Sequence, residues 1–257
     1  MTAFKPQKTN SFGGIKLAVQ KTAEEKPEVL TAPAPTKTLI EIERDVLDIN
    51  NRMAERNRGY FEAKNITAFN LVSSPGSGKT SILERTLADL GDKIKFYVIE
   101  GDQQTARDAE RIAASGAPVV QINTGKGCHL EANMVNDALR KMNPSENAVV
   151  MIENVGNLVC PSAFDLGESA RVVVISITEG EDKPIKYPDM FRSAQLCLIN
   201  KTDLLPYLKF DLDALKNYAR QVNPALRFIE VSATTGAGME AWYQFITNPN
   251  LPQEDKN

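Results

Sequence analysis

The chain has 257 residues, 42% of them hydrophobic and 25% charged, which is enough to bury one substantial core. A formal net charge of −3 and a pI near 5.5 give no electrostatic reason to expect nucleic acid or a membrane surface as a partner. The small, odd number of three cysteines predicts reduced thiols. The sequence has no long apolar N-terminal segment and no apolar run near the ~20 residues of a membrane helix, which predicts a cytoplasmic protein without membrane contact.

The ends of the chain differ from its middle. Residues 1–37 mix Lys, Thr, Pro, Ala and Gly without sustained periodicity and are predicted to form a flexible tail, with a second tail at 251–257. An amphipathic helix is predicted over residues 38–57, because apolar residues recur there at spacings of three and four: Leu39, Ile42, Val46, Ile49 and Met53. We expect its apolar face to cover a sheet; the alternative is a face that binds a partner.

Short β-branched runs then alternate with helix-like stretches. The runs are LVSS, KFYVIE, PVVQI, AVVMIE, RVVVISI, QLCLIN and RFIEVS, and the helical stretches are 81–90, 103–115, 130–142 and 211–222. Continuous apolar runs that alternate with helices indicate strands buried on both faces of a mainly parallel sheet. The pattern predicts an α/β fold of three layers over residues 38–250, with its ligands beyond the carboxyl ends of the strands.

The segment SSPGSGKT at 73–80 lies between the first predicted strand and a helix-like stretch. A glycine loop that opens a helix can direct its backbone N–H groups at phosphate oxygens, while Lys79 adds a charge and Thr80 a hydroxyl for Mg²⁺. Ser73 replaces the usual first glycine of the motif, although Gly76 and Gly78 are retained. We therefore predict a P-loop NTPase fold, rather than an ordinary strand-turn-helix corner, with a phosphate site formed by Ser74, Pro75, Gly76, Ser77, Gly78, Lys79, Thr80 and Ser81.

Three carboxylates end or follow predicted strands. Asp102 follows KFYVIE, and Asp108 lies six residues further on. Glu153 in IENVGN occupies the place where GTPases usually carry Asp in an Asp-x-x-Gly motif, and the N–H of Gly156 can sense a γ-phosphate. We predict a catalytic set and Mg²⁺ ligands here; which carboxylate holds Mg²⁺ and which orients water stays open, and a helix N-cap is the alternative for Asp102. The catalytic set is Lys79, Asp102, Asp108, Glu153 and Gly156, and the Mg²⁺ ligands are Thr80, Asp102 and Glu153.

The only histidine, His129, directly follows Cys128 in a glycine-flanked loop after PVVQI, and Cys160 lies in the loop after AVVMIE. Both loops are expected at the same edge of the sheet, where one imidazole and two thiolates suit Ni²⁺, Zn²⁺ or Cu. The set is one ligand short of a tetrahedral site, so a water or a second copy of the chain is expected to complete it. Cys197, within QLCLIN, is predicted to be a small core residue.

NKTD at 200–203 follows a later predicted strand. A carboxylate at Asp203 can accept hydrogen bonds from N1–H and the 2-amino group of guanine, which adenine does not offer, while Lys201 can lie along the base. Asn200 is predicted to belong to the same site, and Ser232 and the N–H of Ala233 in VSATTG can face the guanine carbonyl. The order of these motifs after a phosphate loop predicts binding of GTP and GDP.

The segments SSPGSGKT, EGDQQTARDAERI, NTGKGCHLEANMV, IENVGNLVCP, FDLGE, NKTD and VSATTG resemble those of the HypB family, the GTPases that insert nickel into hydrogenases, over residues 38–247. This resemblance implies hydrolysis of GTP to GDP and phosphate, delivery of nickel to the [NiFe]-hydrogenase large-subunit precursor, a nickel chaperone as partner and a homodimer promoted by GTP. The family's metal site maps onto Cys128, His129 and Cys160. Because residues 1–37 contain neither Cys nor His, the N-terminal nickel binding of some members is not expected.

GTP is expected to move the Gly156 loop and with it Cys160, four residues further on, so that nucleotide state alters metal binding. Intrinsic turnover is expected to be slow, because no arginine can be assigned as a finger that contacts the γ-phosphate.

Three alternative functions remain: a P-loop kinase that phosphorylates a small molecule, a scaffold whose dimer is bridged by metal, and a urease-type nickel GTPase. The urease family, however, carries Cys-Pro-His where Cys128 and His129 are adjacent here.

Overall fold

The computed structural model describes residues 38–102 and 107–249, apart from a few side chains near the start of the first helix and that of Arg107. The predicted tails at 1–37 and 251–257 lie outside the described residues, so the predicted domain boundaries stay a prediction. No helix in the described ranges is long and apolar enough to cross a membrane.

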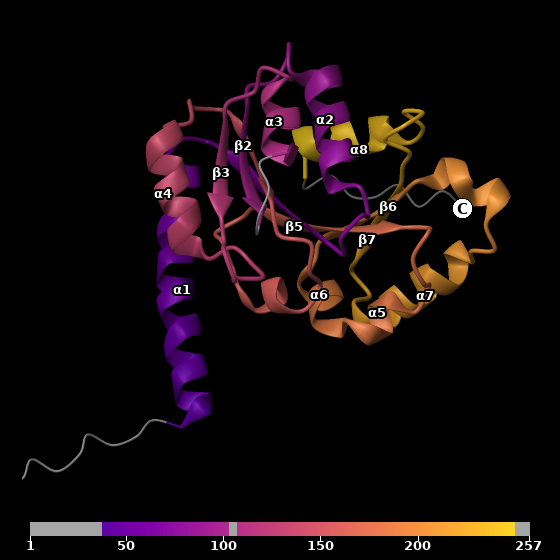
Figure 1. Cartoon of the computed structure of the whole chain (residues 1–257), viewed down its shortest axis with the longest axis horizontal. Coiled ribbons are helices and arrows are strands. Elements are labelled where there is room, and N and C mark those ends of the chain that lie inside the picture. Colours follow the sequence, from indigo (N-terminus) through magenta and orange to yellow (C-terminus); the bar gives the residue numbers. More distant parts are fainter. Residues whose placement is uncertain (1–37, 103–106, 250–257) are drawn as a thin grey trace, which may run out of the picture. The chain divides into compact units, whose positions relative to one another are not determined.

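Seven strands form one sheet, in the order β3-β2-β4-β1-β5-β6-β7 (Figure 1). Each coincides with a predicted run, and every neighbouring pair is parallel, so the prediction of a mainly parallel sheet is confirmed. The strands are β1 Thr67–Ser73, β2 Phe96–Asp102, β3 Val119–Asn123, β4 Val149–Glu153, β5 Ala170–Ser176, β6 Leu196–Asn200 and β7 Arg227–Glu230. The strand that leads into SSPGSGKT is therefore the central one.

Helices cover both faces of the sheet and give the predicted three layers (Figure 1). One face packs against α2, α3 and α8, and the other against α1, α4, α6 and α7. The α-helices are α1 Leu39–Ala63, α2 Lys79–Leu90, α3 Arg107–Ala113, α4 Ala132–Met142, α5 Lys183–Lys186, α6 Pro188–Ser193, α7 Leu212–Val222 and α8 Met239–Thr247, and the 3-10 helices are η1 Cys160–Ala163 and η2 Thr202–Tyr207.

The predicted helix boundaries need small corrections. The stretch predicted at 103–115 is helical over Arg107–Ala113, while residues 103–106 lie outside the described part. The stretch predicted from residue 211 begins one residue later, because the carboxylate of Asp211 caps the helix by accepting the N–H of Ala214. Helices α5, α6 and α8 were not predicted.

The central strand β1 alternates between the two faces and carries one buried polar residue. Phe69 and Leu71 belong to the core beneath α2 and α8. On the opposite face Ala68 and Val72 belong to two separate apolar clusters, and Asn70 lies between them with none of its surface exposed. The core on that face is thus divided by an amide, which must find hydrogen-bond partners inside the protein.

The predicted apolar face of α1 is wrong for part of the helix. Val46 and Ile49 are 45% and 61% exposed, and the side chains of Leu39 and Ile42 lie outside the described ones. The face that α1 buries against α4 and the sheet consists instead of Asn50, Ala54, Asn57 and Phe61. A hydropathy pattern treats Asn50 and Asn57 as solvent-facing residues. It therefore predicts a different face of the helix to be buried.

The buried face of α1 gives a direct stability test. Replacing Phe61, which is 2% exposed, by Ala should lower the free energy of unfolding by about 3–5 kcal/mol because it leaves a cavity. Ile49→Ser should change it by less than about 0.5 kcal/mol because that side chain is exposed. Chemical denaturation of the two variants measures both values, and equal destabilisation would contradict the assignment of the buried face.

Candidate functional site: a nucleotide loop beside a metal-ligand cluster

The loop 73–80 joins the carboxyl end of β1 to the first turn of α2. Gly78 has φ +99°, and a Cβ there would lie 2.4 Å from Nδ2 of Asn200, so the loop packs directly on the NKTD segment. Nζ of Lys79 donates a buried hydrogen bond of 2.7 Å to Oγ of Ser73. The serine that replaces the first glycine of the motif therefore holds the lysine over its own loop.

Asn200 links all three predicted nucleotide-binding segments. Its Nδ2 donates to the carbonyl of Ser77 at 3.0 Å, and its Oδ1 accepts the N–H of Ala233 at 3.3 Å. Because β6 lies two strands from β1, the parallel sheet brings the ends of these segments to one edge.

The remaining predicted base-binding groups lie around the same loop. Nζ of Lys201 donates to the carbonyl of Gly76 at 2.7 Å. The hydroxyl of Ser232 donates to a carboxylate oxygen of Asp203 at 2.6 Å, which orients the carboxylate predicted to read guanine. The structure thus gathers the predicted nucleotide-binding residues into one site.

Thr80 and Glu153 lie side by side behind the phosphate loop. Oγ1 of Thr80 donates to Oε1 of Glu153 at 2.7 Å. Glu153 is only 4% exposed, and its second oxygen has no hydrogen-bond partner within the described ranges. A hydroxyl beside a buried carboxylate that keeps an oxygen free fits a hard cation such as Mg²⁺.

Glu100 is a third carboxylate at this place, and the predicted site does not include it. It pairs with Glu153 in the register of β2 and β4, it is 2% exposed, and its Oε2 has no partner in the described part of the chain. Burial, followed by the charges of Glu153 and Asp102, raises the pKa of Glu100 to about 8. The sequence did contain a signal for this residue, because KFYVIE is an apolar strand-like run that includes a glutamate.

Buried Lys79 and Glu153 oppose each other's desolvation. Burial lowers the pKa of Lys79, and the charge of Glu153 counteracts this. Burial likewise raises the pKa of Glu153 against the charge of Lys79. The charged side chains of this site are therefore poorly solvated. A bound anion and its cation can interact with them directly, with little competition from water.

The two predicted aspartates occupy different places. Asp102 ends β2, where its carbonyl accepts the N–H of Thr124. The alternative role for Asp102, as the N-cap of a helix that starts at residue 103, stays a prediction because residues 103–106 lie outside the described part. Asp108, in the first turn of α3, forms an ion pair of 3.2 Å with Arg111, which also pairs with Glu84 on α2. The assignment of Mg²⁺ and water to these carboxylates stays a prediction.

The segment after β4 passes the phosphate loop on its way to Cys160. A Cβ at Gly156 would lie 3.1 Å from Cα of Pro75, so the two backbones are in close contact. Cys160 begins η1 four residues later. The place predicted to sense the γ-phosphate thus lies one short segment away from a candidate metal ligand.

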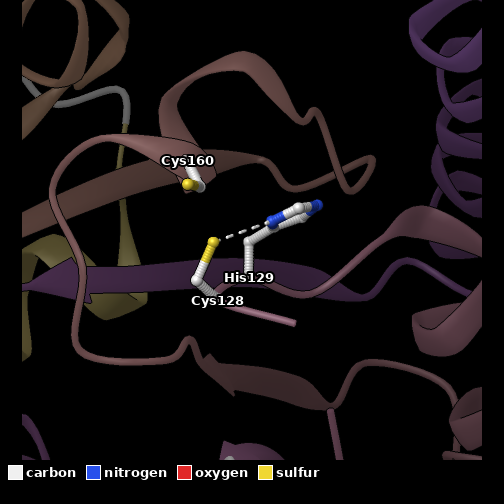
Figure 2. Close-up of side chains that lie close together, drawn as sticks. All are labelled: Cys128, His129 and Cys160. Carbon is white, nitrogen blue, oxygen red and sulfur yellow. Dashed lines mark hydrogen bonds between the residues drawn. The ribbon is translucent and has the colours of Figure 1, made fainter. Parts of the chain in front are cut away.

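The three candidate metal ligands lie together, as predicted. One ligand atom each from Cys128, His129 and Cys160 can be chosen so that all lie within 4.8 Å of one another. Figure 2 shows Nδ1 of His129 directed at the Cys128 sulfur, 3.7 Å away, with the Cys160 sulfur beside them. The ring of Phe164 stacks on the imidazole at 3.9 Å and fixes its plane.

The electrostatics of this cluster suit a metal ion. Burial lowers the pKa of His129, so its imidazole is neutral near pH 7 and able to ligate. Hydrogen bonding with Cys160, followed by burial, raises the pKa of the Cys128 thiol, so metal binding must displace a proton there. Oε1 of Glu131 lies 3.9 Å from Nε2 of His129, too far for a hydrogen bond, and Nε2 has no hydrogen-bond partner within the described residues. Cys197, by contrast, is buried in the core, as predicted.

Two further charged residues that were not predicted contact the phosphate loop. Glu179 accepts a hydrogen bond of 2.7 Å from the hydroxyl of Ser77. Nζ of Lys183 lies 3.1 Å from Glu179 and donates to Oγ of Ser74 at 2.9 Å. Both residues follow β5, so charged residues after a buried strand at this edge were the available signal.

Comparison with known proteins gives the family. The model of the CobW/HypB/UreG nucleotide-binding domain matches residues 67–230. "Hydrogenase maturation factor HypB" of Escherichia coli (strain K12) is 56% identical over 210 residues, which are 82% of this chain and 72% of that protein. The chain belongs to the HypB family.

Solved HypB structures have the same fold. The crystal structure of HypB from Archaeoglobus fulgidus superposes with a TM-score of 0.73 at 40% identity, covering 79% of this chain and 98% of that one. HypB from Helicobacter pylori, crystallised in complex with nickel, gives 0.72 at 38% identity, covering 77% and 93%. These likenesses confirm the predicted P-loop NTPase fold and the resemblance to HypB.

The raised pKa of Glu100 predicts how stability varies with pH in the protein free of nucleotide and metal. In the folded chain Glu100 keeps its proton up to about pH 8, whereas in the unfolded chain it loses the proton near the ordinary value of 4.5. The folded state therefore binds more protons between these values, and stability falls as pH rises through this window. Glu100→Gln should reduce that slope. Parallel Tm profiles for the two proteins between pH 5 and pH 8 would contradict the prediction.

Proposed function

We propose that this HypB-family protein is a GTPase that binds nickel at Cys128, His129 and Cys160 and releases it to a [NiFe]-hydrogenase large-subunit precursor, with a nickel chaperone as a further partner. Its similarity to hydrogenase maturation factors supports the pathway, and the nickel complex of the Helicobacter pylori relative supports the metal. Thiolate and imidazole also suit Zn²⁺, so the choice of nickel rests on this relationship.

The segment from Glu153 to Cys160 carries the proposal. It begins at the carboxylate bonded to Thr80, touches the phosphate loop at Gly156 and ends at a metal ligand. A γ-phosphate that repositions Gly156 also displaces the Cys160 sulfur, because only three residues separate them. Nucleotide and metal then change each other's affinity by the same factor.

Mg²⁺ fits beside the nucleotide, held by the hydroxyl of Thr80 and the free oxygen of Glu153. When bound, it neutralises charge on the phosphate oxygens during hydrolysis. Lys79 supplies a second positive charge from the loop itself. Turnover by the isolated protein is slow in this proposal, because no arginine is assigned to the terminal phosphate.

The metal site also connects to dimerisation. Three ligands leave a tetrahedral site incomplete, and a second copy of the chain across a two-fold axis can supply the rest. GTP promotes that dimer if it shifts the loop bearing Cys160 toward the partner copy. The nucleotide then controls whether the ion is shared between two subunits or released.

The base preference gives the first test. Asp203 accepts two hydrogen bonds from guanine, and a bidentate contact to a base edge contributes about 1–3 kcal/mol. Asp203→Asn should weaken GTP by that amount and favour xanthosine triphosphate, whose 2-carbonyl accepts a hydrogen bond from the new amide. Titration with GTP, ATP and xanthosine triphosphate measures this. Equal binding of ATP and GTP by the unmodified protein would favour the P-loop kinase.

Coupling gives the second test. Ni²⁺ affinity and oligomeric state are measured side by side with GDP and with a non-hydrolysable GTP analogue, and the Ni²⁺ dissociation constants should differ by about 5- to 150-fold. Lys79→Ala should bind Ni²⁺ without this difference, and Cys160→Ser should weaken Ni²⁺ in both states. Equal Ni²⁺ affinity in the two nucleotide states would exclude the coupling, and metal delivery by Lys79→Ala at the normal rate would favour the scaffold.

A further inference from the structure

A chain of buried polar side chains lies between the two loops that carry the metal ligands. Oδ1 of Asn154 accepts the N–H of Leu130, the residue after His129, at 3.1 Å. Its Nδ2 donates to Oδ1 of Asn70 at 3.3 Å. Nδ2 of Asn70 in turn donates to a carboxylate oxygen of Glu168 at 3.1 Å. The His129 loop is thus connected through β1 to the segment that follows η1.

The far end of this chain reaches the loop of Cys160. Glu168 pairs with the guanidinium of Arg171 at 3.1 Å, and both side chains are 6% exposed. Arg171 donates hydrogen bonds of 2.8 Å to the carbonyls of Ser162, within η1, and Phe164, whose ring stacks on His129. Both halves of the metal site are therefore tied to one buried network.

The chemistry of the two ends fixes the direction of every link. The carboxylate of Glu168 only accepts, so Asn70 must direct its NH₂ there and its oxygen at Asn154. The N–H of Leu130 only donates, so Asn154 must direct its oxygen there. With Asn70 fully buried and Asn154 2% exposed, any alternative orientation leaves a polar group unpaired in the interior. The network is rigid for this reason.

Asn154 is also next to the predicted nucleotide site. It directly follows Glu153, whose carboxylate accepts the hydroxyl of Thr80, and its own N–H donates to Leu71 in the strand that leads into the phosphate loop. We propose that Asn154 transmits the nucleotide state to the Cys128–His129 loop, so that both halves of the metal site respond together. This inference rests on the proposed coupling of GTP and nickel, and it names the residue that extends the coupling beyond Cys160.

A movement of residues 153–156 affects the two halves of the metal site by different means. Cys160 follows because it is in the same backbone segment. The loop of His129 is separate from that segment in sequence and follows it through hydrogen bonds: the N–H of Leu130 donates to Oδ1 of Asn154, and Nδ2 of Asn157 donates to the carbonyl of Cys128 at 3.3 Å. Asn154 is therefore a positioning residue, which acts on the metal through Leu130 and does not itself ligate.

The protein contains a matched control for this role. Asn57, on α1, is fully buried and donates to the carbonyls of Ala132 and Leu166 at 2.8 and 3.0 Å. It ties together the same two loop regions from the side of α1. Within the described part of the chain, its hydrogen bonds go to Ala132, Leu166 and Asn136, none of them beside the nucleotide. Its loss should disturb the metal site equally in both nucleotide states.

The experiment measures Ni²⁺ dissociation constants of the full chain with GDP and with a non-hydrolysable GTP analogue. Asn154→Ala should lower their ratio from a starting value of about 5 to 150 without bringing it to one, because Cys160 still follows the nucleotide through the backbone. Asn57→Ala should weaken Ni²⁺ in both states and keep the normal ratio. An unchanged ratio in Asn154→Ala would overturn the inference and leave the proposed coupling intact.

Hydrogen exchange in the unmodified protein provides a measurement that does not depend on whether Asn154→Ala folds. Protection of the Leu130 amide should differ between the GDP and GTP-analogue forms, because its acceptor belongs to Asn154. Equal protection would also overturn the inference. If the unmodified protein itself binds Ni²⁺ equally in both states, the proposed coupling fails first, and this outcome is distinct from the loss of Asn154's role alone.

Discussion

The hydrogen bond from Thr80 to Glu153 is the contact on which the arrangement of the two sites depends. It joins the first turn after the phosphate loop to the end of β4, and the segment that continues from β4 ends at Cys160. The bond is possible because β1 and β4 are neighbours in register, with Leu71 opposite Glu153. A nucleotide bound at the loop is therefore separated from the metal ligands by one hydrogen bond and a short run of backbone.

The topology alone does not explain the metal cluster. Cys128 follows β3 and Cys160 follows β4, but β2 lies between these strands, so their ends are about two strand spacings, or roughly 10 Å, apart. The loops must therefore lean across the end of β2 to bring the ligand atoms within 4.8 Å. Buried amides hold them there: Asn154 on the sheet side and Asn57 on the side of α1. Asparagines that are not candidate ligands thus connect the two loops by hydrogen bonds.

This explains how far the sequence can predict the molecule. The seven strands were predictable because buried parallel strands are continuous apolar runs, and the site motifs were predictable because such sheets place ligands at one edge. Asn70 and the asparagines on the buried face of α1 were missed because their burial is compensated by partners distant in sequence, as Asn70 is by Glu168, and residue patterns contain no information about such partners. Glu100 differs, because one of its oxygens has no partner within the described residues and its burial instead raises its pKa.

A polar link suits a switch better than an apolar one. Apolar contacts are non-directional, so packing alone does not specify which group a small shift at Gly156 moves. A hydrogen bond between buried groups is directional and costly to leave unmade, so the N–H of Leu130 must follow the oxygen of Asn154. In the proposed coupling, the buried amides of Asn70 and Asn154 provide a directional connection between the end of β4 and both loops of the metal-ligand cluster.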